Sequence, residues 1–214
     1  MVFRLPSGRA MGRPACISQH TATFPHPIAF GQPTCLVLSG CSLSPLLLNC
    51  NTRIEVRESV VEGMQHTLDI AFEDMNGDLT TLRELGAPST EHWVVVNVAS
   101  ACGFTRQYAG LQTLSLQEGV TVVGFPCNQF GAQEPGTHEE ICAFTADTFD
   151  VDFPLMAKTD VKGENVTPLF AHLSSFSNAS GKGGDIRWNF EKFLINAKGE
   201  VTRFSSGTEP EELL

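Results

Sequence analysis

The chain has 214 residues, of which 42% are hydrophobic and 18% charged, a composition that supports a packed core rather than a disordered chain. Residues 1–54 hold four of the 14 basic residues and no acid, whereas the rest of the chain holds all 24 acids and carries a net charge of −14. Because such a charge repels phosphate backbones, nucleic acid is excluded as an expected partner.

Residues 1–60 are interpreted as an N-terminal extension to a folded domain at 61–214. The extension is rich in Ser, Pro and Arg, and its first 54 residues lack acids, as organelle transit peptides do. A disordered tail or a mis-assigned start codon fits equally well, and Leu38–Cys41 resembles a bacterial lipoprotein cleavage box. A transit peptide would direct the chain to a plastid or mitochondrion, and otherwise we expect a cytoplasmic protein. No segment has the length and hydropathy of a membrane span, so no stable membrane insertion is expected.

The first half of the domain alternates predicted strands and helices. Residues 67–73 alternate apolar and polar and precede Asn76-Gly77, a pattern typical of a hairpin with a tight turn. Residues 93–99 (WVVVNVA) and 120–125 (VTVVGF) are apolar and rich in β-branched residues, as strands buried on both faces are. Between them, residues 105–117 have apolar side chains at helical spacing.

The second half adds helices and another hairpin. Helices are expected at 138–145, after Thr167-Pro168, and from Thr208 to the last residue, where the helix looks cut short. Residues 190–195 and 201–204 flank a turn that contains Gly199, which predicts a second hairpin. This order indicates an α/β domain of the thioredoxin-like plan, in which helices flank a central mixed β-sheet, here preceded by a β-hairpin.

Cys102 is the candidate reactive residue. Seven cysteines, an odd and sparse set, do not suggest a disulfide scaffold. Cys102 follows a buried strand and precedes a helix that begins near Thr105, and a helix N-terminus stabilises a thiolate. Thr105 stands where a C-x-x-C motif has its second cysteine, so single-thiol chemistry such as attack on a peroxide is favoured over dithiol exchange. The alternative is that Cys102 is a small buried apolar residue.

Three segments carry a family resemblance. They are VNVASACGFT at 96–105, GFPCNQFGAQEPG at 124–136 and RWNFEKFLI at 187–195, and together they resemble the glutathione peroxidases over roughly residues 66–212. The resemblance implies a peroxidatic role for Cys102 and catalytic roles for Gln133, Trp188 and Asn189. The indole and amide N–H groups are donors that could stabilise a thiolate and the charge on a leaving oxygen.

The resemblance also implies a reaction. The enzyme would reduce hydrogen peroxide and organic or lipid hydroperoxides to water or alcohols through a Cys102 sulfenic acid. Thioredoxin or glutathione would restore the thiol as a co-substrate, with no bound cofactor and no metal. The short stretch between Val166 and Asp185 resembles the compact branch of the family, so a monomer is expected.

The thiol that resolves the sulfenic acid is left open. In cysteine-type relatives a second cysteine does this, but the corresponding position here holds Thr145. Cys142, three residues earlier on roughly the same helix face, is the candidate resolving residue, and the alternative is that it is inert. Cys127 is interpreted as a buried cysteine without a redox role. If no cysteine resolves, glutathione would attack directly.

Three other readings compete. One is a peroxide-sensing relay, which passes its oxidation to a partner protein with little turnover. Another is an inactive domain used for binding, against which the intact set of candidate residues argues. The third is a metal site, because His138 and Cys142 stand four apart on a helix, although no further ligands cluster with them.

Overall fold

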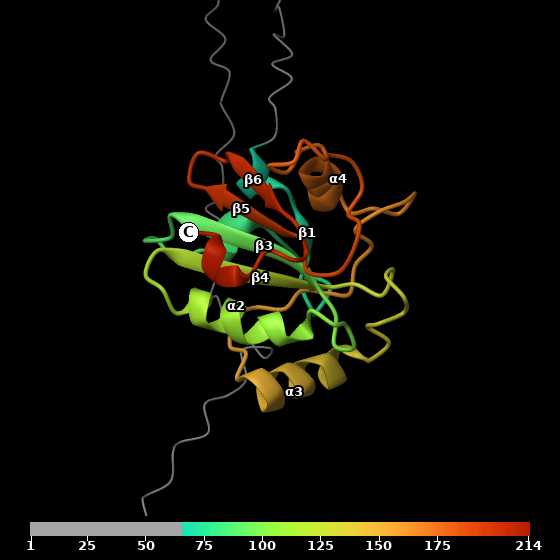
Figure 1. Cartoon of the computed structure of the whole chain (residues 1–214). Coiled ribbons are helices and arrows are strands. Elements are labelled where there is room, and N and C mark those ends of the chain that lie inside the picture. Colours follow the sequence, from blue (N-terminus) through green and yellow to red (C-terminus); the bar gives the residue numbers. More distant parts are fainter. Residues whose placement is uncertain (1–65) are drawn as a thin grey trace, which may run out of the picture. The chain divides into compact units, whose positions relative to one another are not determined.

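A computed structural model describes residues 66–214 (Figure 1). The extension at 1–60, including the cleavage-box resemblance at 38–41, lies outside the described residues. Within residues 66–214, no helix is long and apolar enough to cross a membrane.

A four-stranded mixed sheet forms the centre of the described domain. The strands are β3 (His92–Val98), β4 (Val120–Pro126), β5 (Lys192–Asn196) and β6 (Val201–Phe204), in the spatial order β4-β3-β5-β6. β3 pairs parallel with β4 and antiparallel with β5, and β6 pairs antiparallel with β5. The predicted mixed sheet and the second hairpin are confirmed.

The sheet is buried on both faces, as the apolar runs predict. Trp93 and Val95 of β3 belong to one hydrophobic cluster, and Val94 and Val96 to another. Alternate residues of a strand point to opposite faces, so β3 feeds both cores. Helices cover both faces of the sheet: α2 (Tyr108–Ser115) and α3 (His138–Phe149) lie on one face and α4 (Pro168–Ser174) lies on the other (Figure 1).

The N-terminal hairpin is also present, in a shorter form. β1 (Phe72–Glu73) pairs with β2 (Leu79–Thr80), and Gly77 adopts the positive φ of 83° that the turn between them requires. Residues 67–69, predicted as part of the first strand, form the 3-10 turn η1 instead. The short helix α1 (Leu82–Leu85) follows and begins with a capping box at Thr81.

Three helix boundaries differ from the sequence prediction. The helix expected at 105–117 is split into the 3-10 turn η2 (Thr105–Gln107) and α2. Helix α3 continues to Phe149 and ends where Asp150 takes the left-handed conformation, at φ 54°. The last predicted helix is a single 3-10 turn, η3 (Pro210–Glu212).

Candidate functional site

Strand direction brings the three family-like segments to one edge of the sheet. β3 and β4 are parallel and end in register, with Val98 opposite Pro126. β5 is antiparallel to β3, and its first residue, Lys192, lies opposite Val96. The turns that follow β3 and β4 and the segment that precedes β5 therefore meet at the same edge. These segments carry Cys102, Gln133 and the Trp188-Asn189 pair, respectively.

The Cys102 turn is closed by Thr105. The Thr105 hydroxyl accepts a hydrogen bond from the Cys102 backbone N–H at 3.0 Å and donates one to the Ala99 carbonyl at 2.8 Å. Thr105, at the position where a C-x-x-C motif has its second cysteine, thus holds the turn instead of supplying a thiol. The half-buried Cys102 sulfur accepts from the Phe104 backbone N–H at 3.5 Å, at the start of η2.

Gln133 and Asn189 are in direct contact. The Asn189 side-chain Nδ2 donates to Gln133 Oε1 at 3.0 Å, and Asn189 is fully buried. The backbone carbonyl of Gln133 accepts a hydrogen bond from the Ala101 backbone N–H at 3.0 Å, and this bond places Gln133 beside the Cys102 turn. Since Oε1 of Gln133 is occupied by Asn189, its Nε2 is the end left to donate.

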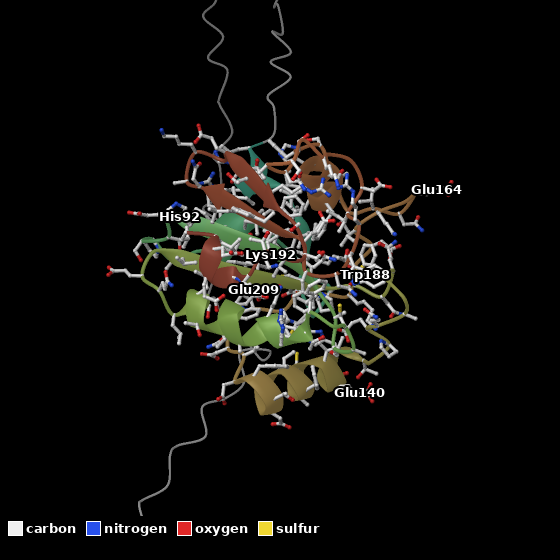
Figure 2. All side chains as sticks on the ribbon, in the orientation of Figure 1. His92, Glu140, Glu164, Trp188, Lys192 and Glu209 are labelled. Atoms are coloured by element: carbon white, nitrogen blue, oxygen red, sulfur yellow. The ribbon has the colours of Figure 1, made fainter. Side chains whose placement is uncertain are left out.

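Asn97 of β3 holds the segment that carries Trp188. Its Nδ2 donates to the Trp188 carbonyl at 3.1 Å, and its Oδ1 accepts from the Glu191 backbone N–H at 3.1 Å. Between them, Phe190 has a positive φ of 64°, so β5 begins at Lys192 and not at 190 as predicted. Figure 2 shows Trp188 at the rim of the domain, and its ring lies 5.8 Å from that of Phe130.

The structure brings the predicted residues to one edge of the sheet, but their side chains do not bond to the Cys102 sulfur. In residues 66–214, no hydrogen bond runs from the side chain of Gln133, Trp188 or Asn189 to Cys102 Sγ. Gln133 and Asn189 are joined to each other, and the Gln133 backbone is joined to the Cys102 turn, whereas Trp188 contacts Asn97 through its backbone carbonyl and Phe130 through its ring. The roles of these side chains in the reaction are therefore proposals.

The two other cysteines in the described part of the chain differ in environment. Cys127 is fully buried, and burial raises the pKa of its thiol, which opposes reactivity. Cys142 lies on α3 with 8% of its surface exposed, and its sulfur lies 3.1 Å from His138 Nε2. Cys142 is disulfide-bonded in the structure, so a resolving role requires that it first be reduced. Among residues 66–214, no cluster of three or more metal-ligating side chains is present around His138 and Cys142.

Lys192 and Glu134 are among the buried ionisable residues near this edge that sequence reasoning missed. Lys192 Nζ donates to the carbonyls of Phe190 at 2.9 Å, Thr208 at 2.7 Å and Ser206 at 3.4 Å, and burial lowers its pKa to about 8. Glu134 is 0% exposed, and its pKa is raised by burial. A lysine inside the apolar run KFLI was a usable signal, whereas nothing local distinguishes Glu134 from a loop residue.

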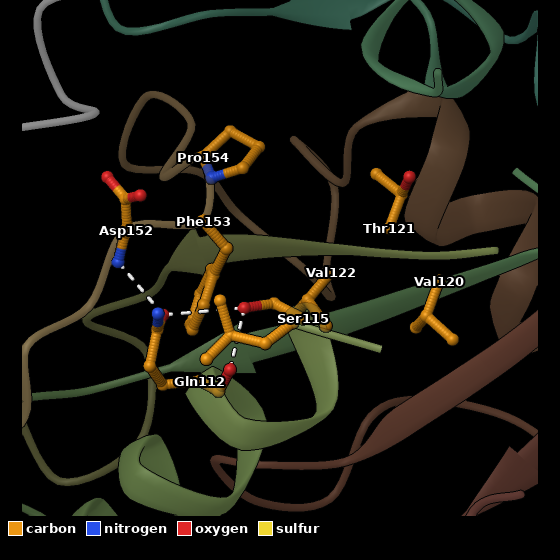
Figure 3. Close-up of a pocket in the computed structure, with 9 residues that line it drawn as sticks. Gln112, Ser115, Val120, Thr121, Val122, Asp152, Phe153 and Pro154 are labelled. Carbon is orange, nitrogen blue, oxygen red and sulfur yellow. Dashed lines mark hydrogen bonds between the residues drawn. The ribbon is translucent and has the colours of Figure 1, made fainter. Parts of the chain in front are cut away.

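A small cavity lies away from this edge, at the start of β4 (Figure 3). Gln112 shapes its wall, since its Oε1 accepts from the Asp152 backbone N–H at 2.9 Å and its carbonyl from the Ser115 hydroxyl at 2.8 Å. Because β4 runs from Val120 to Pro126, this cavity and the Cys102 turn lie toward opposite ends of the strand. None of its lining residues belongs to the candidate site.

Comparisons with known proteins point in one direction. The family model described as Glutathione peroxidase matches residues 67–174. Glutathione peroxidase-like peroxiredoxin gpx1 of Schizosaccharomyces pombe is 44% identical over 154 residues, which cover 70% of this chain and 95% of that protein. Hydroperoxy fatty acid reductase Gpx2 of Synechocystis sp. is 50% identical over 121 residues, covering 55% and 75%. The crystal structure of T. cruzi GPX1 is 30% identical with a TM-score of 0.54, covering 69% of this chain and 91% of that one.

Proposed function

Because the chain belongs to the glutathione peroxidase family, we propose that Cys102 is the peroxidatic residue of this enzyme and that Gln133, Trp188 and Asn189 assist it. The domain has the thioredoxin-like fold, and the enzyme is a thiol peroxidase, an oxidoreductase that reduces hydroperoxides.

The observation that carries the proposal is the placement of one accessible thiol. Cys102 and Cys127 are the free cysteines among residues 66–214, and Cys127 is fully buried. Cys102 is partly exposed, sits in the turn before η2 and lies at the edge where the other family-like segments meet. A peroxide arriving from solvent therefore reaches Cys102 and not Cys127.

The reaction follows from the donors around this turn. The Cys102 thiolate attacks one oxygen of the hydroperoxide, an S–O bond forms, and the O–O bond breaks. The leaving oxygen takes a proton and departs as water or an alcohol, so the peroxide is reduced and the sulfur is oxidised to a sulfenic acid. Gln133 Nε2 and the Trp188 indole N–H would stabilise the negative charge that develops on the leaving oxygen.

Thioredoxin is the proposed reductant. Two thiols must supply the electrons that return the sulfenic acid to a thiol, with water as the other product. Two of the similar proteins carry peroxiredoxin in their names, as enzymes that use protein dithiols do. Cys142 on α3 is the candidate resolving thiol, and glutathione is the alternative reductant.

Organic and lipid hydroperoxides are the proposed substrates beside hydrogen peroxide. Trp188, which lies at the same edge of the sheet as Cys102, is 39% exposed, so this edge is open to solvent at that side chain and leaves room for a group attached to the peroxide. The relative from Synechocystis sp. is named for hydroperoxy fatty acids, which are substrates of this kind.

Coupled assays test the proposal. The enzyme would be mixed with hydrogen peroxide or a fatty-acid hydroperoxide and either thioredoxin with its reductase or glutathione with its reductase, and NADPH loss would be followed. We expect Cys102→Ser to abolish turnover in both assays and Cys127→Ser, the matched control, to retain it. Full activity in Cys102→Ser would refute the assignment. Oxidation limited to one equivalent of peroxide in the wild-type protein, with both reductants present, would instead indicate a sensor.

A further inference from the structure

Two adjacent hydrogen bonds join the Cys102 turn to the Gln133 turn. The Ala101 backbone N–H donates to the Gln133 carbonyl at 3.0 Å, and the Ser100 hydroxyl donates to Glu134 Oε2 at 3.1 Å. Ser100 and Ala101 directly precede Cys102, and Glu134 directly follows Gln133. The Ser100–Glu134 bond thus joins a carboxyl group next to Gln133 to a hydroxyl two residues before Cys102.

Glu134 is itself held rigidly. It is fully buried, and its backbone N–H donates to Asn128 Oδ1 at 2.9 Å. The turn that leads into it contains two consecutive residues with positive φ, Gly131 at 64° and Ala132 at 52°. A non-glycine residue at positive φ persists only where its surroundings fix the backbone. The Asn128 and Ser100 contacts of Glu134 supply such fixing.

No cation balances this carboxyl within residues 66–214. Glu134 forms no ion pair there, and its Oε1 has no hydrogen-bond partner. The charged and titratable groups that act on it are few. Lys158, from the segment between α3 and α4, is exposed and donates to the Gly136 carbonyl. Tyr108 of α2 is fully buried, and burial together with the Glu134 charge raises the pKa of its hydroxyl well above the usual value.

Burial of an unpaired carboxylate is unfavourable, and the protonated form avoids that cost. Desolvation accordingly raises the pKa of Glu134. The hydrogen bond from Ser100 lowers this pKa and so partly offsets the effect of burial.

We propose that Glu134 is a positioning residue, whose buried carboxyl holds Ser100 and thereby fixes the Cys102 turn against the Gln133 turn. The proposal rests on the proposed function, because it concerns the geometry in which Cys102 reacts. It adds to that function a residue that would contact neither the peroxide nor the sulfur.

A pair of isosteric variants tests it. Glu134→Gln keeps an oxygen that accepts from Ser100 and removes the ability to ionise, while Glu134→Leu keeps similar volume and removes the acceptor. The full chain would be reduced, and the single-turnover rate with hydrogen peroxide measured by stopped flow. We expect Glu134→Gln to stay within about twofold of the wild-type rate and Glu134→Leu to fall at least about tenfold, since small displacements of reacting groups slow a reaction strongly.

A pH profile separates positioning from a general loss of structure. Alkylation of Cys102 by iodoacetamide would be followed by mass spectrometry of its peptide from pH 4 to 10. We expect Glu134→Gln to leave the midpoint of this profile unchanged. A midpoint displaced to lower pH, with faster alkylation at neutral pH, would show that Glu134 acts on Cys102 through its charge and not by holding Ser100, and would overturn the proposal.

Ser100→Ala keeps the test decisive if Glu134→Leu does not fold. This variant removes the hydroxyl that Glu134 holds, and we expect its peroxide rate to fall at least about fivefold with circular dichroism unchanged. A wild-type rate in Ser100→Ala, or in folded Glu134→Leu, overturns the positioning role. The proposed function fails separately, through activity that survives in Cys102→Ser.

Discussion

Asn189 donates a hydrogen bond to Gln133 Oε1 at 3.0 Å across 56 residues of sequence. This contact fixes which end of the Gln133 amide faces away from Asn189. Because the oxygen is engaged, the NH₂ group is the end available to a reacting oxygen or sulfur. The contact also couples the segment before β5 to the turn after β4, two of the three segments that meet at the sheet edge.

Asn189→Asp should reverse this orientation. An ionised Asp can only accept hydrogen bonds, so the Gln133 amide would turn its NH₂ toward it and present oxygen outward. We expect the single-turnover peroxide rate to fall about 10²-fold, in the range seen when one charge-stabilising donor is removed. Asn189→Ala and Gln133→Ala should be strongly non-additive in the double variant. A wild-type rate in folded Asn189→Asp would show that this orientation does not matter.

The buried pair formed by Glu191 and Arg203 should dominate stability at this edge. Arg203 Nη2 lies 2.7 Å from Glu191 Oε2, with side-chain exposures of 1% and 6%. Removing one partner strands the other charge, so Glu191→Gln should lower the free energy of unfolding by about 3–5 kcal/mol. Urea denaturation measures this. The matched control is Arg106→Gln, which breaks an exposed pair with Glu209 and should change stability by no more than about 1 kcal/mol.

Lys192 should make stability rise with pH in the alkaline range. Its folded pKa of about 8 lies below the ordinary lysine value of 10.5, because desolvation outweighs the nearby acids Glu209, Glu191 and Glu212. Between these values the unfolded chain binds more protons, so stability increases as pH rises. From pH 8 to 9.5 the gain should be roughly 1–2 kcal/mol.

The Lys192 effect is best measured as a difference. Tyr108 and Cys127 have raised pKa values, so their ionisation in the unfolded chain lowers stability as pH rises and partly masks the gain. Subtracting the urea-denaturation curve of Lys192→Met from that of the wild type removes their contribution. Equal pH slopes in the two proteins would refute the prediction.

A resolving role for Cys142 predicts a selective defect. Cys142→Ser should lose turnover with thioredoxin by at least about tenfold, because the sulfenic acid would no longer become a disulfide that thioredoxin can reduce. Its single-turnover reaction with peroxide should be unchanged, since Cys102 is intact. All proteins would be reduced beforehand, and Cys127→Ser serves as the matched control. Unchanged turnover with thioredoxin would leave direct reduction of Cys102 as the route.

Sequence patterns predicted the elements whose cause is local. The run from Trp93 to Val98 is apolar on both faces, and the structure buries it on both faces. The turn at Gly199 was readable because it needs the positive φ of 82° that the structure shows. Cys102, Gln133, Trp188 and Asn189 were identified from family-like motifs, and the shared sheet edge follows from strand direction.

What the sequence could not show depends on contacts between distant residues. Asn97 looks like one polar interruption in an apolar strand, yet its side chain holds the backbone of Trp188 and Glu191. The same contacts, with the strained φ of Phe190, delay the start of β5 to Lys192. Whether a loop acid such as Glu134 is buried depends on how two turns pack together, which no local pattern records.

Arg203 also holds the loop between α4 and Trp188. Its Nη1 donates to the Phe176 carbonyl at 3.2 Å and to the Gly184 carbonyl at 2.7 Å, so one side chain binds both ends of the loop at 177–183. The entropic cost of lengthening a loop between two fixed ends grows only logarithmically with its length. Insertions at 177–183 should therefore cost little stability, and the segment that carries Trp188 should keep its place.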